Sequence, residues 1–112
     1  MRTMEVDGGR RDLRRFKRVK VDVRVAVLHA SRFRIERGLQ LSEGGMLIST
    51  PQAFPPGQEI ELNFFIADDF VRARAQVIYA HKDAAGGGCV GLRFLTLSRQ
   101  ALMAIRTAVS TP

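Results

Sequence analysis

Two separated stretches of the sequence carry side chains suited to binding an anion. The first is the basic run at residues 14–18, RRFKR, and the second is the stretch at residues 40–45, QLSEGG. Guanidinium groups hold phosphate oxygens through paired hydrogen bonds and can also lie flat on a purine. Ser42 can donate to a phosphate or ribose oxygen, and the paired glycines leave backbone N–H groups free to donate. We therefore interpret the two stretches as the halves of one phosphate-binding pocket.

The sequence offers little for catalysis or metal binding. His29 and His81 have no second histidine, cysteine or carboxylate at metal-ligand spacing. Cys89 begins a predicted strand and fits a small core or edge residue better than a nucleophile. The glycines at 86–88 are not followed by the Lys-Ser/Thr pair of a P-loop. We expect neither an enzyme nor a protein that carries a metal or a cofactor.

Basic charge is concentrated at the N-terminus. The chain has a net charge of +7, and its first twenty residues hold eight basic side chains against three acidic ones, which leaves +5 on this segment. Such a segment repels itself and should be extended and solvated unless an anion orders it. Its charge alone fits a solubilising tail, or a site for nucleic acid, anionic lipid or a phosphorylated small molecule.

Hydrophobic alternation with a period of two predicts the strands that must position these groups. Six segments rich in β-branched and aromatic residues follow one another at short spacing, which favours a barrel or a sandwich. They lie at residues 19–27, 33–41, 46–49, 60–66, 71–79 and 90–94. In the second segment Phe33, Ile35 and Leu41 share one phase and are expected to be buried together. In the fifth segment Tyr79 shares the phase of Val77, so both side chains are expected on the same face of the strand.

One helix is predicted after the last strand. Ser98 can cap its N-terminus, and Leu102, Ile105 and Val109 fall on one face at helical spacing. That face is expected to pack against the open end of the barrel. Because the first two strands are expected to be neighbours, the start of the first strand should lie beside the turn that follows the second.

Length and composition indicate one small globular domain. The chain has 112 residues, of which 46% are hydrophobic and 26% are charged. We expect a flexible basic arm at residues 1–18 and a barrel with its C-terminal helix at residues 19–112. No apolar run is long enough to cross a membrane, and no apolar segment follows the charged N-terminus as in a signal peptide. Together with the single cysteine, these features predict a cytoplasmic protein.

The two motifs, taken in order, resemble those of the PilZ domain family. PilZ domains carry RxxxR just before the first strand and [D/N]xSxxG after the second. Arg14 and Arg18 match the first motif, and Ser42 and Gly45 match the second. Residues 90–94, VGLRF, also resemble the family's last strand before a C-terminal helix. The resemblance covers residues 10–109, and two motifs in order with a matching strand count make it specific.

The resemblance implies a mainly β protein, a six-stranded antiparallel barrel with one C-terminal helix, that binds cyclic di-GMP without catalysis. The ligand is commonly bound as an intercalated dimer. The arm would fold over it and change the surface shown to a protein partner, with a role in bacterial motility or surface behaviour. Arg14 and Arg18 would contact phosphate and guanine edges, while Ser42 and the turn backbone hold the opposite side. The residues expected at the ligand are Arg14, Arg15, Arg18, Gln40, Ser42, Gly44 and Gly45.

Gln40 stands where the family has Asp or Asn, and this departure leaves an alternative open. Glutamine is one methylene longer than asparagine, loses more side-chain entropy when fixed and caps its own turn less readily. A displaced hydrogen bond costs about 1–3 kcal/mol. The alternative is therefore a degenerate PilZ adaptor that binds a protein partner without nucleotide.

Nucleic-acid binding by the basic arm and the arginines of the strand surfaces is a third hypothesis. Barrels that bind single-stranded DNA or RNA expose aromatic rings on which the bases stack. Here Phe33 shares the phase of the core, which leaves Phe16 and Phe70 as the candidates for exposure. We therefore rank this hypothesis below the other two.

Overall fold

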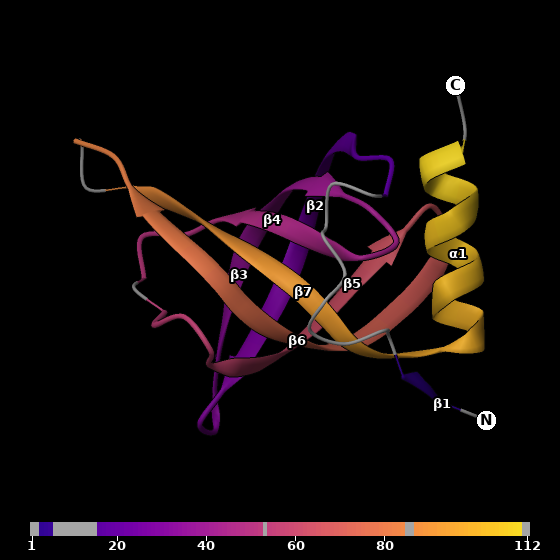
Figure 1. Cartoon of the computed structure of the whole chain (residues 1–112), viewed down its shortest axis with the longest axis horizontal. Coiled ribbons are helices and arrows are strands. Elements are labelled where there is room, and N and C mark those ends of the chain that lie inside the picture. Colours follow the sequence, from indigo (N-terminus) through magenta and orange to yellow (C-terminus); the bar gives the residue numbers. More distant parts are fainter. Residues whose placement is uncertain (1–2, 6–15, 53, 85–86, 111–112) are drawn as a thin grey trace.

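Six antiparallel strands close into a barrel with one helix beside it (Figure 1). The structure, a computed structural model, describes residues 3–5, 16–52, 54–84 and 87–110. The barrel strands are β2 (Val19–His29), β3 (Arg32–Leu41), β4 (Gly45–Ser49), β5 (Glu59–Ile66), β6 (Asp69–Lys82) and β7 (Gly88–Ser98), and α1 spans Arg99–Ser110. The strands pair in the order β7-β4-β3-β2-β5-β6, and pairing of β6 with β7 closes the ring. The predicted six-stranded barrel and its C-terminal helix are confirmed.

A short strand that was not predicted lies outside this ring. β1 (Thr3–Glu5) pairs antiparallel with the end of β7, with Thr3 opposite Ser98 and Glu5 opposite Thr96. Three residues are too few to show a hydrophobic period, so the sequence carried no signal for this strand. The backbone of residues 3–5, within the segment expected to be an extended arm, is therefore attached to the sheet.

The core fills the space between the inner faces of the strands. Val25 and Val27 of β2 are 0% and 2% exposed, while the intervening and flanking residues of the strand face outward. Leu92 and Phe94 of β7 are also fully buried. Burying each side chain of this size stabilises the folded state by about 1.5–3 kcal/mol. The alternation seen in the sequence therefore corresponds to the inside and outside of the barrel.

The first half of β3 has the opposite orientation to the one predicted. Phe33 and Ile35 are 67% and 55% exposed, whereas Glu36 is buried. A β-bulge between Gly38 and Gln40 inserts one residue and shifts the phase, so that Leu41 faces the core again. The prediction that Phe33 and Ile35 are buried with Leu41 is wrong, because alternation was extended through a bulge.

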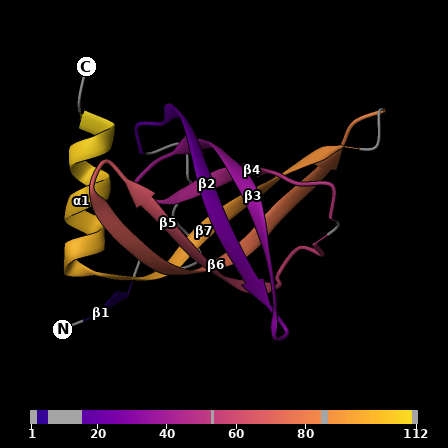
Figure 2. The same cartoon turned by 180° about the vertical axis from the view of Figure 1, so that it is seen from behind.

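The C-terminal helix packs against one end of the barrel, as Figure 2 shows from behind. Ser98 Oγ accepts a hydrogen bond of 3.0 Å from the Ala101 amide, which confirms the predicted cap. Ile105 and Val109 are buried against the barrel, while Leu102 is only partly buried. Over the described residues, no helix has the length and apolar character needed to span a membrane.

Candidate functional site

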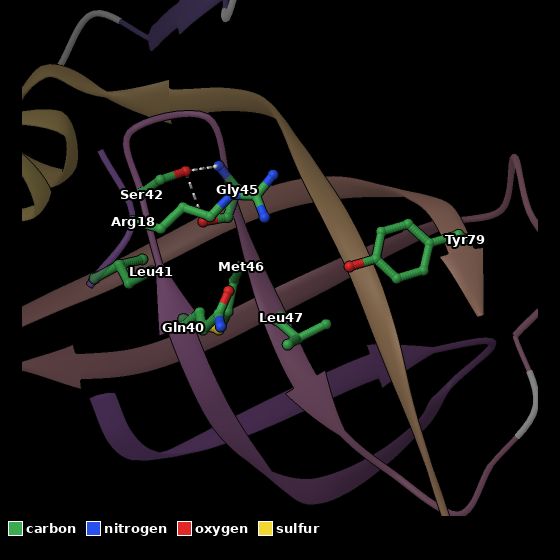
Figure 3. A pocket seen from close by; sticks show the side chains of 8 residues that line it. All are labelled: Arg18, Gln40, Leu41, Ser42, Gly45, Met46, Leu47 and Tyr79. Carbon is green, nitrogen blue, oxygen red and sulfur yellow. Dashed lines mark hydrogen bonds between the residues drawn. The ribbon is translucent and has the colours of Figure 1, made fainter. Parts of the chain in front are cut away.

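A small pocket forms where the start of β2 lies beside the end of β3. Val19 pairs with Leu41 and Lys20 pairs with Gln40, which confirms that the first two barrel strands are neighbours. The pocket has a volume of about 30 Å³ (Figure 3). It is lined by Arg18, Gln40, Leu41, Ser42, Gly45, Met46, Leu47 and Tyr79.

The residues expected at the ligand fall into three groups. One group lines the pocket and consists of Arg18, Gln40, Ser42 and Gly45. Gly44 is buried in the adjacent turn and does not line the pocket. Arg14 and Arg15 lie outside the described residues. The structure therefore brings together the parts of the candidate site that come from β2, β3 and β4, and the contribution of the arm stays a prediction.

Two polar side chains of the pocket have no hydrogen-bond partner among the residues that the structure describes. Arg18 is exposed, and within the described residues its guanidinium has neither a hydrogen bond nor an ion pair. The partly buried side chain of Gln40 likewise has no hydrogen-bond partner there. A guanidinium donates to phosphate or to a purine acceptor, and a side-chain amide both donates and accepts. These two side chains can therefore contact an anion and the edge of a heterocycle at the mouth of the pocket.

Ser42 holds the turn between β3 and β4 in shape. Its Oγ accepts hydrogen bonds of 3.1 Å from the amides of both Gly44 and Gly45. The Ser42 amide in turn donates to the Gly45 carbonyl at 2.9 Å. The expectation that these glycine amides are free for a ligand is therefore wrong in this structure. Because Ser42 is only 3% exposed, its main action here is to fix the turn.

Gly45 is required by the close approach of β4 to β7. It lies opposite Arg93 in the pairing of these strands, and a Cβ on it would sit 1.9 Å from the Leu92 carbonyl oxygen. No side chain fits at that distance from a backbone atom. The glycine at the end of the SxxG motif thus has a structural reason that is independent of any ligand.

Tyr79 is a pocket residue that was not predicted. A register shift between Val77 and Tyr79 turns its ring out of the core, and the residue is 46% exposed. The ring passes over Gly91, where an added Cβ would lie 2.3 Å from Tyr79 Cε2. Figure 3 shows its hydroxyl directed toward the side chains of β3 and β4. Gly91 inside the VGLRF strand was the available signal, since a glycine within a strand often marks such a close approach.

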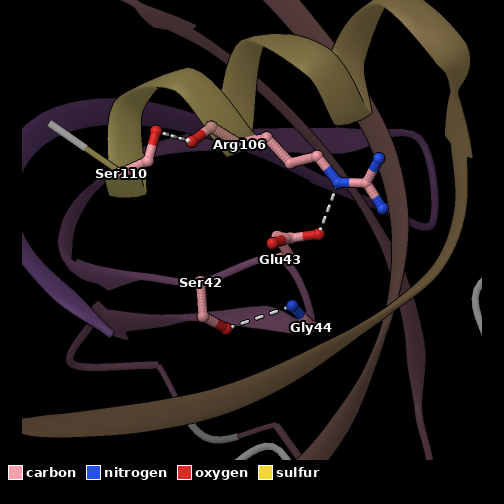
Figure 4. A network of polar contacts seen from close by, with 5 residues as sticks. All are labelled: Ser42, Glu43, Gly44, Arg106 and Ser110. Atoms are coloured by element: carbon pink, nitrogen blue, oxygen red, sulfur yellow. Dashed lines mark hydrogen bonds and ion pairs between the residues drawn. The ribbon is translucent and has the colours of Figure 1, made fainter. Parts of the chain in front are cut away.

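The turn of the pocket is also tied to the helix. Arg106 Nε on α1 donates a hydrogen bond of 2.7 Å to Glu43 Oε1 (Figure 4). The Glu43 side chain is 27% exposed, and that of Arg106 is 54% exposed. The residue between Ser42 and Gly44 therefore connects the pocket to the C-terminal helix.

A second arginine lies close to the turn. Arg93 is the β7 partner of Gly45, and one of its terminal nitrogens donates to Gln76 Oε1. Its Nε is buried and has no hydrogen-bond partner among the described residues. Arg93 and Arg18 add positive charge near a turn whose one carboxylate is already paired with Arg106.

The described part of the chain does not contain a group of three or more His, Cys, Asp or Glu side chains arranged to hold a metal ion. The His29 imidazole contacts the side-chain amide of Gln58 instead. Cys89 is a free, partly buried thiol at the start of β7. The pocket itself offers hydrogen-bonding groups, a positive charge and an aromatic ring, from Gln40, Arg18 and Tyr79.

Comparison with known proteins gives a family match and a set of similar folds. The sequence profile of the PilZ domain matches residues 12–110. No curated protein matches the chain in a sequence search. The Bacillus subtilis inhibitor of motility, MotI/DgrA, has a similar structure, with a TM-score of 0.74 and 14% identity over 87% of this chain. The chain spans about half of that protein, covering 49% of it.

Two PilZ-domain structures are similar over most of their length. The PilZ domain of YcgR from Escherichia coli, solved with c-di-GMP, has a TM-score of 0.70 and 18% identity, covering 88% of this chain and 89% of that one. The PilZ domain of CeSA from a cellulose-synthesizing bacterium has a TM-score of 0.60 and 17% identity, covering 82% and 93% respectively. At these identities the likeness establishes the fold.

Proposed function

The chain belongs to the PilZ domain family, and we propose that it is a receptor for cyclic di-GMP that signals through contact with another protein. PilZ domains are receptor and adaptor domains rather than enzymes, and the YcgR domain of similar fold was solved with c-di-GMP. One observation carries the proposal. The Arg18 guanidinium and the Gln40 amide, which have no partner among the described residues, line one pocket beside the glycine turn together with the half-exposed ring of Tyr79.

The three side chains suit two chemical parts of a cyclic dinucleotide, its phosphate and its base. The Arg18 guanidinium can bind a phosphate through paired hydrogen bonds. The Gln40 amide can donate to and accept from the edge of a guanine. The Tyr79 ring offers an aromatic face for a base, and stacking of a base on such a ring contributes about 1–3 kcal/mol.

The pocket alone is too small to enclose such a ligand. Its volume of about 30 Å³ is far below the roughly 300–1,000 Å³ of pockets that bury a small molecule. The remaining contacts must come from elsewhere, and we assign them to Arg14 and Arg15 of the arm. Ordering each arm residue costs about 1–2 kcal/mol. Each charge-assisted hydrogen bond to phosphate stabilises the complex by about 1.5–3 kcal/mol. A few such bonds therefore offset the entropy cost of ordering a short stretch of the arm.

The glutamine in place of Asp or Asn is compatible with this proposal. Gln40 lines the pocket, and its side-chain amide has no hydrogen-bond partner among the described residues. The longer side chain therefore still presents its amide for a ligand. An intercalated ligand dimer, a cytoplasmic location and a role in motility or surface behaviour belong to the same proposal. If the chain does not bind cyclic di-GMP in the following experiment, the alternative of a degenerate adaptor that binds a protein without nucleotide is favoured.

Calorimetric titration of the full chain with cyclic di-GMP tests the proposal. Cyclic di-AMP and GMP serve as ligand controls. We expect selective binding of cyclic di-GMP that Arg18→Ala weakens by roughly tenfold to a hundredfold, since a hydrogen bond to a charged group contributes about 1.5–3 kcal/mol.

Arg24→Ala is the matched control. Arg24 is an exposed arginine of β2 that does not line the pocket and has no ion pair within the described residues. This variant loses the same charge and should keep wild-type affinity. No binding by the wild type, or equal weakening by both variants, would contradict the proposal.

A further inference from the structure

The β2–β3 hairpin leaves part of β3 unpaired along one edge. β4 pairs with β3 from Arg37 to Leu41. Residues 32–36 pair with β2, and among the described residues no strand covers their other side. Figures 1 and 2 both show the tip of this hairpin projecting beyond the rest of the barrel. An open strand edge of this kind is a template for pairing with another chain.

The turn geometry identifies the backbone groups that face this open edge. Ala30 and Ser31 form the two-residue turn, with φ of 51° and 66°, as in a type I′ hairpin. The closing pair, His29 and Arg32, is therefore hydrogen-bonded, and pairs alternate from there. It follows that the N–H and C=O groups of Phe33 and Ile35 point away from β2, toward the open edge.

A groove of about 990 Å³ lies at the tip of the same hairpin. It is lined by Val27, His29, Ala30, Ser31, Arg32, Phe33, Arg34, Gln52 and Phe54. Because the lining includes both strands of the hairpin, its turn and the start of β3, the groove surrounds the hairpin tip and reaches the beginning of the open edge. Two of the lining residues, Phe54 and His29, are in ring contact, with centroids 6.2 Å apart.

The charge of this groove is positive. Its lining includes Arg32 and Arg34 but no carboxylate. Arg32 has no ion pair within the described residues, while Arg34 lies 3.6 Å from the buried Glu36. The whole chain carries a net charge of +7. An acidic segment is therefore the complementary occupant, and a second copy of the chain would bring the same positive edge and a second net charge of +7.

We propose that an extended acidic segment of a partner protein docks here as an added strand on the open edge of β3. Its backbone bonds to Phe33 and Ile35. Alternate side chains of the added strand meet different surfaces: acidic ones lie beside Arg32 and Arg34, and apolar ones lie beside the exposed rows of Phe33 and Ile35. The recognised pattern is thus acidic and apolar residues in strict alternation. This site does not depend on nucleotide binding, and it lies outside the pocket of Arg18.

A defined peptide tests the proposal with the full chain and without nucleotide. The probe is a fluorescein-labelled peptide in which glutamate alternates with valine, followed by fluorescence anisotropy. Two matched probes replace glutamate with lysine, or methylate the amide nitrogens along one edge of the same peptide. We expect the first probe to bind, and both matched probes to bind at least about tenfold more weakly, because each loses either charge pairing or several backbone hydrogen bonds.

Variants of β3 locate the binding site. Ile35→Pro removes the outward N–H and is compatible with an edge strand, so it should weaken binding at least about tenfold. Ile35→Ala keeps that N–H and loses only the side-chain contact, so it should weaken binding less than Ile35→Pro does. If Ile35→Pro does not fold, the methylated probe still reports on the backbone bonds of the wild-type chain.

Several results would overturn the proposal. These are no binding at millimolar peptide, equal binding of the lysine probe or the methylated probe, and unchanged binding by a folded Ile35→Pro variant. Sedimentation that reveals a dimer of the chain, abolished by Ile35→Pro, would assign the edge to a second copy instead.

Discussion

Arg106 Nε on α1 and Glu43 Oε1 in the turn after β3 are 2.7 Å apart, although 63 positions separate them in the sequence. Glu43 follows Ser42, whose Oγ holds the turn, and Ser42 lines the pocket. A ligand that displaces this turn would therefore move one partner of the pair. The contact gives the C-terminal helix a direct connection to the candidate site.

A double-mutant cycle on this pair should give a small coupling free energy. Both side chains are partly exposed, so we expect about 0.2–1 kcal/mol between Glu43→Ala and Arg106→Ala. Urea denaturation of the wild type, the two single variants and the double variant measures this coupling. Raising the salt concentration should reduce it. A coupling of zero at low salt would mean that the contact does not stabilise the turn against the helix.

Ser42→Ala should destabilise the protein even without ligand. The substitution removes the acceptor for the Gly44 and Gly45 amides, which are buried in the turn. Buried donors left without partners cost about 1–3 kcal/mol. The free energy of unfolding from urea denaturation measures the loss. Unchanged stability together with lost ligand binding would instead make Ser42 a ligand contact.

Gly45→Ala should be among the most disruptive small substitutions in the chain. The added Cβ would meet the Leu92 carbonyl oxygen at 1.9 Å, so β4 and β7 would have to separate. Overpacking of this kind costs about 1–3 kcal/mol or more. Gly87→Ala is the matched control, since its Cβ meets only the Asp83 carboxylate, at 3.2 Å. Thermal unfolding compares the two, and equal effects would contradict the close approach of β4 to β7.

Gly91→Ala should weaken cyclic di-GMP binding without removing any pocket residue. Its Cβ would sit 2.3 Å from the Tyr79 ring and displace it. If the ring stacks on a base, losing that contact costs about 1–3 kcal/mol, or roughly one to two decades of affinity. Calorimetry on Gly91→Ala and Tyr79→Ala checks this, with Gly87→Ala as the glycine control. Wild-type affinity in Tyr79→Ala would exclude a role for the ring.

The sequence predicted the barrel because its alternation reports directly on which side of each strand faces the core. Val25 and Val27 of β2 follow this rule, since both are buried while the residues on either side of them face outward. It failed at Phe33 and at Tyr79, where register shifts near Gly38 and after Val77 change the phase by one residue. A period of two contains no information about where a bulge falls. The signs of these shifts in the sequence were two glycines, Gly38 in β3 and Gly91, which lies opposite Tyr79.

The candidate site was predicted in part for the same reason. Neighbouring first strands place Arg18 beside Gln40 and Ser42, and this follows from an antiparallel order alone. The action of Ser42 on its own turn could not be separated in advance from donation to a ligand, because the motif is the same for both. The contact between Glu43 and Arg106 depends on where α1 packs, which the helical period of the last segment does not determine.

The position of bound cyclic di-GMP tests the central claim most directly. Amide and side-chain resonances of isotope-labelled protein, followed during titration with cyclic di-GMP, report the location of the ligand without any substitution. We predict saturable shifts at Arg18, Gln40 and Tyr79, which line one pocket, and little change at Phe33 and Ile35 on the β2–β3 hairpin. An unchanged spectrum at saturating ligand, or shifts centred on the hairpin, would contradict the account.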